Sequence, residues 1–138
     1  MNNHRNNRLW LLVGVVLILL TLLLTVSACD GGLGVEGTVY EWVDAPAGNN
    51  GEIYVDKAAP AGRMIKPVAS ASVAFSFRTI TTSENGTFER GWVVGPGRYM
   101  MDIKIEKEGY HTLKGEFNHD ATAGQSHLFA IFLVRKET

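Results

Sequence analysis

The sequence predicts an all-β fold, an antiparallel Greek-key sandwich, behind an apolar N-terminal segment. Apolar and polar residues alternate with a period of two in several short segments, which is typical of strands with one buried face. Turn dipeptides such as Asn85-Gly86 and Gly95-Pro96 separate these segments. The chain beyond residue 30 nowhere shows the spacing of an amphipathic helix. Short strands with frequent turns in about 100 residues favour a sandwich.

The N-terminal segment has the layout of a secretory signal peptide. Residues 2–8 are polar and basic, residues 9–26 carry no charge, and small residues lead to the single cysteine, Cys29. A basic region, an apolar region and small residues at a cleavage point are the parts of such a signal. Positively charged residues beside an apolar run favour the cytoplasmic side of the membrane. Arg5 and Arg8 precede the run, so we expect the chain that follows it to lie outside the cytoplasm.

The four residues Val26-Ser27-Ala28-Cys29 resemble the lipobox of bacterial lipoproteins. The resemblance implies cleavage before Cys29, a diacylglyceryl group on its sulfur and acylation of the new amino group. Several acyl chains anchor a protein stably, whereas one does not. Asp30 resembles the signal that retains lipoproteins in the inner membrane. An uncleaved membrane-spanning helix remains the alternative, because the apolar run of 18 residues is long enough to cross a bilayer.

These features divide the chain into a signal peptide (1–28), a lipidated tether (29–34) and one β-domain (35–138). The tether would reach on the order of 15 Å, which keeps the domain close to the bilayer. All 14 acidic residues and 11 of the 13 Lys and Arg follow the signal peptide, so the formal charge there is −3. No basic patch indicates nucleic acid as a partner. With Cys29 lipidated, no thiol remains for a disulfide, a metal or catalysis.

The strands of the domain are predicted from their alternation. They cover residues 35–43, 72–77, 98–106, 111–117 and 128–134. The last of these is apolar on both faces, which indicates a central strand or one covered on both sides. The side chains predicted to point inward are Val73, Phe75, Phe77, Tyr99, Met101, Ile103, Ile105, Leu113 and Phe117.

Residues 44–66 form the longest segment without a clear strand pattern, and loops of this length are often functional. The apolar residues Ile53, Tyr54 and Val55 within it predict either a short extra strand or a contact surface. Together with Trp42 they are the candidate binding surface. Trp42, Tyr54 and Trp92 would also suit an aromatic sugar-binding platform, although core packing is the commoner use of such residues.

Five motifs follow one another in the domain: Val35-x-Gly37-x-Val39, Lys66-Pro67-Val68-x-x-Ala71-x-Val73, Thr82-x-x-x-Gly86-x-Phe88, Gly97-x-Tyr99-x-Met101-x-Ile103 and Gly109-Tyr110. Their order resembles the carboxypeptidase regulatory-like domain over residues 35 to about 134. The resemblance implies a seven-stranded, transthyretin-like (prealbumin-like) sandwich, with glycines in the turns and with Phe88 and Tyr99 in the core. The chain departs from the family at residues 83–85, where an aspartate often precedes the turn glycine.

Candidate chemistry is sparse. His111, His119 and His127 recur every eight residues, and His119, Asp120 and His127 would be able to meet across the intervening loop. Ordinary exposed histidines are the preferred interpretation, so no metal, cofactor or catalytic residue is predicted. No nucleophile motif such as G-x-S-x-G is present.

The function expected from the sequence is that of a cell-envelope lipoprotein, held by lipid at Cys29 on the periplasmic or extracellular face of a bacterial membrane. Its domain is expected to be a non-enzymatic binding or scaffolding module for an envelope protein or a glycan. A carbohydrate- or peptidoglycan-binding module is one alternative, and an assembly component of an envelope complex is another. Sandwich folds host many functions, so the fold does not decide between them.

Overall fold

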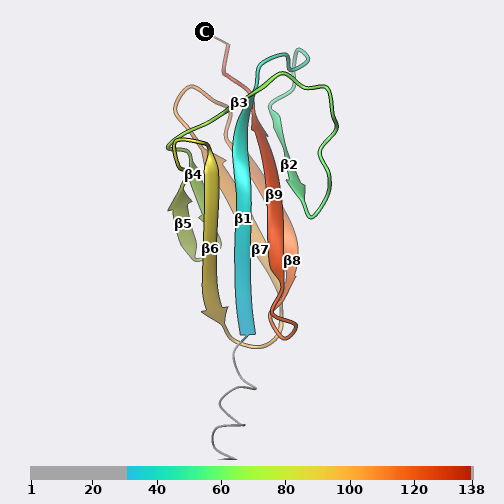
Figure 1. Cartoon of the computed structure of the whole chain (residues 1–138), viewed down its shortest axis with the longest axis vertical. Coiled ribbons are helices and arrows are strands. Elements are labelled where there is room, and N and C mark those ends of the chain that lie inside the picture. Colours follow the sequence, from blue (N-terminus) through green and yellow to red (C-terminus); the bar gives the residue numbers. More distant parts are fainter. Residues whose placement is uncertain (1–30, 138) are drawn as a thin grey trace, which may run out of the picture. The chain divides into compact units, whose positions relative to one another are not determined.

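The computed structural model describes residues 31–137, in which every regular element is a strand (Figure 1). The strands are β1 (Gly31–Trp42), β2 (Gly51–Val55), β3 (Ile65–Pro67), β4 (Ser72–Phe75), β5 (Arg78–Thr81), β6 (Thr87–Val94), β7 (Arg98–Glu106), β8 (Leu113–Asp120) and β9 (Ser126–Leu133). The prediction of an all-β, sandwich-like fold is confirmed. The predicted signal peptide, Cys29 and Asp30 lie outside the described residues. No helix among residues 31–137 is long and apolar enough to span a membrane.

The strands form two sheets. The first has the order β2-β9-β1, and the far edge of β1 pairs with β6 over its first part and with β3 over its last three residues. The second has the order β5-β4-β7-β8. The pairs are antiparallel except for β1 and β9, which run parallel from Gly34↔Ser126 to Glu41↔Leu133. The fully antiparallel arrangement predicted from the sequence is therefore wrong at this central pair.

The core lies between the two sheets and is rich in phenylalanine. Phe75 of β4 lies at its centre, with ring centroids 5.6 Å from Phe129 and 6.1 Å from Phe117. Edge-to-face contacts of this kind add to the free energy gained by burying the rings. Gly37 of β1 is buried beneath these rings, and a Cβ there would lie 2.5 Å from the Phe129 carbonyl oxygen and 2.8 Å from the Phe88 ring. The glycine therefore makes room for the aromatic core.

The motif residues mostly have the predicted physical roles. Gly86 has a φ of +74°, and its carbonyl accepts the Val39 N–H at 2.8 Å, so it forms the turn before β6. Phe88 is buried, as predicted, and Tyr110 of the last motif is buried too. The buried Thr82 hydroxyl donates to the Val68 carbonyl at 2.8 Å and accepts the Ala71 N–H at 2.9 Å. This single side chain ties the turn to the segment that leads into β4.

Two inward predictions are wrong. Tyr99 is 38% exposed because it is the second residue of β7, next to the turn that precedes this strand. Its hydroxyl donates to the Gly95 carbonyl of that turn at 2.8 Å. Phe77 is 46% exposed because β4 ends at Phe75 and the chain turns before β5. The remaining inward predictions in β4, β7 and β8 are confirmed. Alternation therefore held inside the strands and failed at their ends.

Two segments predicted as irregular are strands. Residues 31–34, expected to belong to the tether, are the first part of β1, where Leu33 is buried and pairs with Trp92 of β6. Within segment 44–66, Gly51–Val55 forms β2, which pairs with β9. This confirms the extra strand. The described part has nine strands rather than the seven that the resemblance implies. The strand β9 lies between β1 and β2, which confirms its central position.

Candidate functional site

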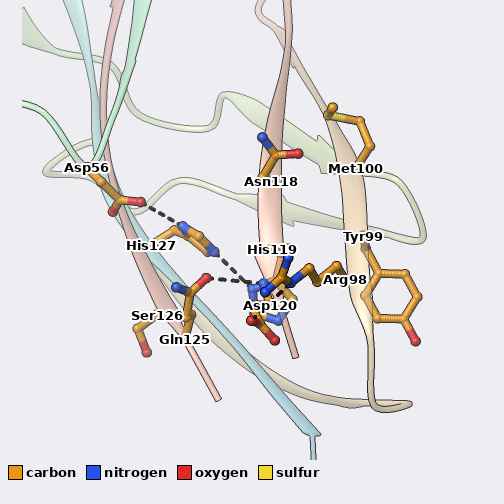
Figure 2. A pocket seen from close by; sticks show the side chains of 10 residues that line it. All are labelled: Asp56, Arg98, Tyr99, Met100, Asn118, His119, Asp120, Gln125, Ser126 and His127. Carbon is orange, nitrogen blue, oxygen red and sulfur yellow. Dashed lines mark hydrogen bonds and ion pairs between the residues drawn. The ribbon is translucent and has the colours of Figure 1, made fainter. Parts of the chain in front are cut away.

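A groove of about 670 Å³ opens where one edge of each sheet ends, near the first residues of β1. Strands β7 and β8 form one wall. The start of β9, together with the residue that follows β2, forms the other. Figure 2 shows the side chains that line it. They are Asp56, Arg98, Tyr99, Met100, Asn118, His119, Asp120, Gln125, Ser126 and His127.

A chain of hydrogen bonds runs behind the groove from Asp56 to the backbone of β1. Asp56 Oδ2 lies 2.7 Å from His127 Nδ1, and His127 Nε2 lies 2.9 Å from His119 Nδ1 (Figure 2). His119 Nε2 in turn lies 3.0 Å from the carbonyl oxygen of Gly32. His119 belongs to β8 and His127 to β9, so these contacts connect the two sheets.

The partners determine where the hydrogens of this chain lie. The Gly32 carbonyl can only accept, so Nε2 of His119 donates to it. A neutral His119 then accepts at Nδ1, and the hydrogen of the second bond comes from Nε2 of His127. The ionised Asp56 carboxylate also accepts, so all three bonds form when His127 carries a hydrogen on both nitrogens. The three bonds together need one hydrogen more than two neutral imidazoles supply.

Burial and charge keep His119 neutral. Its side chain is 1% exposed, and burial together with the charge of His127 lowers its pKa below the ordinary value of 6.5, against the opposing effects of the Gly32 carbonyl and Asp120. A second hydrogen on its Nδ1 would point at the one on His127. Burial opposes ionisation of Asp56, but hydrogen bonds from Leu128 and His127 outweigh it and lower the pKa of this carboxyl.

The backbone around Asp56 is shaped to present its carboxylate. Asp56 has a φ of +53°, a conformation that short polar side chains tolerate better than most. Its N–H donates to the Leu128 carbonyl at 2.8 Å, and the Leu128 N–H donates to its Oδ1 at 2.8 Å. The second carboxylate oxygen is thereby directed at His127. A non-glycine residue held in this region often marks a site with a specific task.

The groove itself is polar and carries charges of both signs. Arg98 and Asp120 lie opposite each other on β7 and β8 and form a long ion pair of 3.6 Å, in which the Arg98 side chain is 89% exposed. Such an exposed pair contributes little to stability and leaves the guanidinium free to bind a ligand. Asn118, Gln125 and the Tyr99 ring add amide groups and one aromatic surface. The groove is suited to a ligand recognised by hydrogen bonds and by contact with one ring.

The interpretation of the histidines as ordinary and exposed is wrong for two of the three. His119 and His127 are buried and contact each other, as the eight-residue spacing allowed, whereas His111 is half-buried elsewhere. Asp56, not Asp120, completes the cluster, and it lies 71 residues before His127. No local pattern could identify it. No group of three His, Cys, Asp or Glu among residues 31–137 is arranged to hold a metal ion.

The predicted binding surface is divided between two faces of the first sheet. Trp42 and Tyr54 lie on the outer face, each in contact with the ring of Phe132 between them. Ile53 and Val55 point to the opposite face and pack against the core. The four residues therefore do not form one patch. Trp92, the third aromatic of the proposed platform, packs against Phe75 and Phe77 and lies apart from the other two.

Arg63 covers the rings of Trp42 and Phe132 on the outer face of the first sheet. Its guanidinium carbon lies 3.8 Å from the centroid of Trp42 and 4.6 Å from that of Phe132, and its side chain is 10% exposed. Nη2 donates to Glu52 Oε2 at 2.6 Å, while Nη1 is buried without a hydrogen-bond partner. The ring faces beside the guanidinium supply the compensating electrostatic contact. Hydrogen bonds from Tyr54 and Arg63 lower the pKa of Glu52, so the pair stays ionised.

Comparison with known proteins gives little further guidance. No family model matches the sequence, and no curated protein matches it. Among solved structures, the chain is similar to the crystal structure of 3-chlorocatechol 1,2-dioxygenase from Rhodococcus opacus 1CP, with a TM-score of 0.49 and 12% identity. The match covers 78% of this chain and 60% of the dioxygenase chain.

This similarity corrects one prediction. The sequence predicts a non-enzymatic domain, but a solved structure that the chain matches is that of an enzyme. The prediction that the chain is not an enzyme is therefore withdrawn. At 12% identity the match assigns no activity to this chain, which spans 60% of the dioxygenase length.

Proposed function

We propose that this chain is a cell-envelope lipoprotein, held by lipid at Cys29, whose β-sandwich binds an envelope component in the groove between β7–β8 and the β8–β9 loop. The sequence Val26-Ser27-Ala28-Cys29 supports the anchor, since only a cysteine thiol offers the thioether site. It supports a periplasmic or extracellular location, and Asp30 favours the inner membrane. The proposal also retains the carboxypeptidase regulatory-like, transthyretin-like type of sandwich, which the turn at Gly86 and the buried Phe88 support.

The single observation that carries the binding role is the lining of the groove. Arg98, Asn118 and Gln125 are exposed, and Asp120 is half-buried. Together these side chains offer hydrogen-bond donors and acceptors around a concave surface with one tyrosine ring. Ligand sites combine concavity with a few polar groups that converge on the ligand. The hydrogen bonds behind the groove hold His119 and His127 rigid, which reduces the entropy lost on binding.

A glycan is the ligand class that this lining favours. Sugars present many hydroxyl groups that both donate and accept, and they present apolar faces that stack on aromatic rings. The amides and the Tyr99 ring of the groove offer both kinds of contact. The original platform of Trp42 and Tyr54 is less suitable, because Arg63 already occupies the ring faces. An envelope protein bound in the same groove is the second candidate.

Binding to purified peptidoglycan fragments tests this proposal. Arg98→Ala and Asn118→Ala remove exposed lining groups, so the fold should tolerate both, and each should weaken binding about tenfold, as expected for one lost charged or bidentate contact. Arg78→Ala, on the distant strand β5, is the matched control and should bind as the parent does. If the parent binds glycan and both groove variants bind equally well, the groove is not the site. If only proteins are recovered by crosslinking, and the groove variants lose them, the second candidate is favoured.

A further inference from the structure

One end of the sandwich is formed by the first residue of β1 and by two loops. The β6–β7 turn (residues 95–97) and the β8–β9 loop (residues 121–125) lie at the same end as the start of β1, and the C-terminal residues lie at the other end (Figure 1). Hydrogen bonds join the two loops: the Ala121 N–H donates to the Gly97 carbonyl at 2.9 Å, and the Gly97 N–H donates to Thr122 Oγ1 at 3.2 Å. The loops therefore form one continuous surface.

This end has no charged residue in either loop. Residues 91–97 (GWVVGPG) and 121–126 (ATAGQS) are uncharged, and the nearest charged pair, Arg98 and Asp120, lies at the rim. Val93 is 79% exposed, the largest exposed fraction among the large apolar side chains of the described residues. Its paired residue on the neighbouring strand β1 is Gly32, which has no side chain to cover the valine.

The opposite end has a different character. Its turns and its C-terminal segment carry alternating charges, which suit contact with water. These charged residues are Asp44, Glu84, Lys107, Glu108, Arg135, Lys136 and Glu137. The contrast between the two ends is not required by the core, because both sets of loops lie outside it. It indicates that the two ends face different surroundings.

We propose that the uncharged end lies against the lipid bilayer, with Val93 in the headgroup region. The inference rests on the proposed lipidation of Cys29, which lies two residues before Gly31 in the sequence and so within about 7 Å of it along an extended chain. Apolar side chains gain free energy when they enter the membrane–water interface. The groove then opens beside the membrane surface.

Spin labels on the lipidated full chain test this docking. If Cys29 is lipidated, the parent has no free thiol, so Val93→Cys and Glu84→Cys each introduce a single labelling site, at the two opposite ends. Both positions are exposed, so the fold should tolerate the label. In vesicles of phosphatidylethanolamine and phosphatidylglycerol, collisions with a water-soluble nickel chelate should be about threefold rarer at position 93 than at position 84, because headgroups exclude the chelate.

The outcomes separate the docking from the anchor. If the parent protein itself takes up the label, Cys29 is a free thiol, and the proposed function fails together with this inference. If the parent stays unlabelled but the chelate reaches positions 93 and 84 equally often, the anchor stands and the docking is overturned. Thr122→Cys, in the second loop, should behave as position 93 does. Full access to the chelate at position 122 in the lipidated chain would equally contradict the proposal.

Discussion

Replacing His119 by leucine should destabilise the domain through the network behind the groove. Leucine approximates the size of the imidazole but makes no hydrogen bond, so the variant leaves the Gly32 carbonyl and Nε2 of His127 unpaired in a buried place. Each unsatisfied buried group costs about 1–3 kcal/mol, and the added apolar burial offsets part of this. We expect a net loss of about 2–4 kcal/mol, a large share of the free energy of unfolding of a domain this small.

The same variant should also change how stability depends on pH. Because the pKa of His119 is lowered in the folded protein, the unfolded chain binds the proton more readily, and the free energy of unfolding falls as the pH drops below the ordinary value of 6.5. The leucine variant lacks this contribution. The difference in stability between parent and variant should therefore be larger at pH 7.5 than at pH 5.5. Asp56, whose pKa is lowered from 3.8, loses its stabilising effect only at still lower pH.

Urea unfolding of a fragment beginning at Asp30, followed by tryptophan fluorescence at both pH values, measures these differences. The matched control is His111→Leu, which changes a half-buried histidine outside the network. The control should not reproduce the pH-dependent difference. A His119→Leu variant that differs from the parent by less than about 0.5 kcal/mol would refute the reasoning, since this is the range of ordinary surface substitutions. A difference that is equal at both pH values would refute the part concerning protonation.

Three further predictions concern the fold. Arg63→Ala should lower the free energy of unfolding in urea by about 1–3 kcal/mol. Arg63→Lys should recover less than half of this loss, because an ammonium cannot stack flat on two rings. A lysine variant as stable as the parent would contradict this. Phe88→Ala should cost about 3–5 kcal/mol, whereas Tyr99→Ala should cost less than about 1 kcal/mol, and a reversed order in thermal unfolding would contradict the assigned burial. A fragment beginning at Gly34 should be less stable than one beginning at Asp30, because it lacks the buried Leu33; equal urea midpoints would show that the first residues of β1 are dispensable.

Much of the fold could be predicted from alternation. Strict alternation within β4 and β7 identified buried residues such as Val73 and Ile103, and the doubly apolar β9 was recognised as central. The start of β1 was missed because glycines have low strand propensity, although pairing with β6 and β9 on both sides holds them in the sheet. The parallel pairing of β1 with β9 leaves no local signal, since the alternation of side chains is the same in both directions.

The candidate site could be predicted only in part. The spacing of His119 and His127 allowed them to meet, but burial was not foreseen, because isolated histidines are more often exposed. Asp56 and Arg63 escaped notice because each lies far along the chain from a partner it contacts, and both sit in a segment that reads as a loop. The hypothesis of an aromatic platform grouped Trp42, Tyr54 and Trp92. The first two both contact Phe132, but Trp92 lies apart, and Arg63 covers the aromatic face.

The most direct test of the proposed function is the mass of the N-terminal peptide of the protein purified from membranes. The account predicts a chain that starts at Cys29 and carries a diacylglyceryl group on its sulfur, and it predicts that Cys29→Ser accumulates as the uncleaved precursor. A chain that starts at Met1 with an unmodified Cys29 would contradict the lipid anchor and favour a membrane-spanning N-terminal helix.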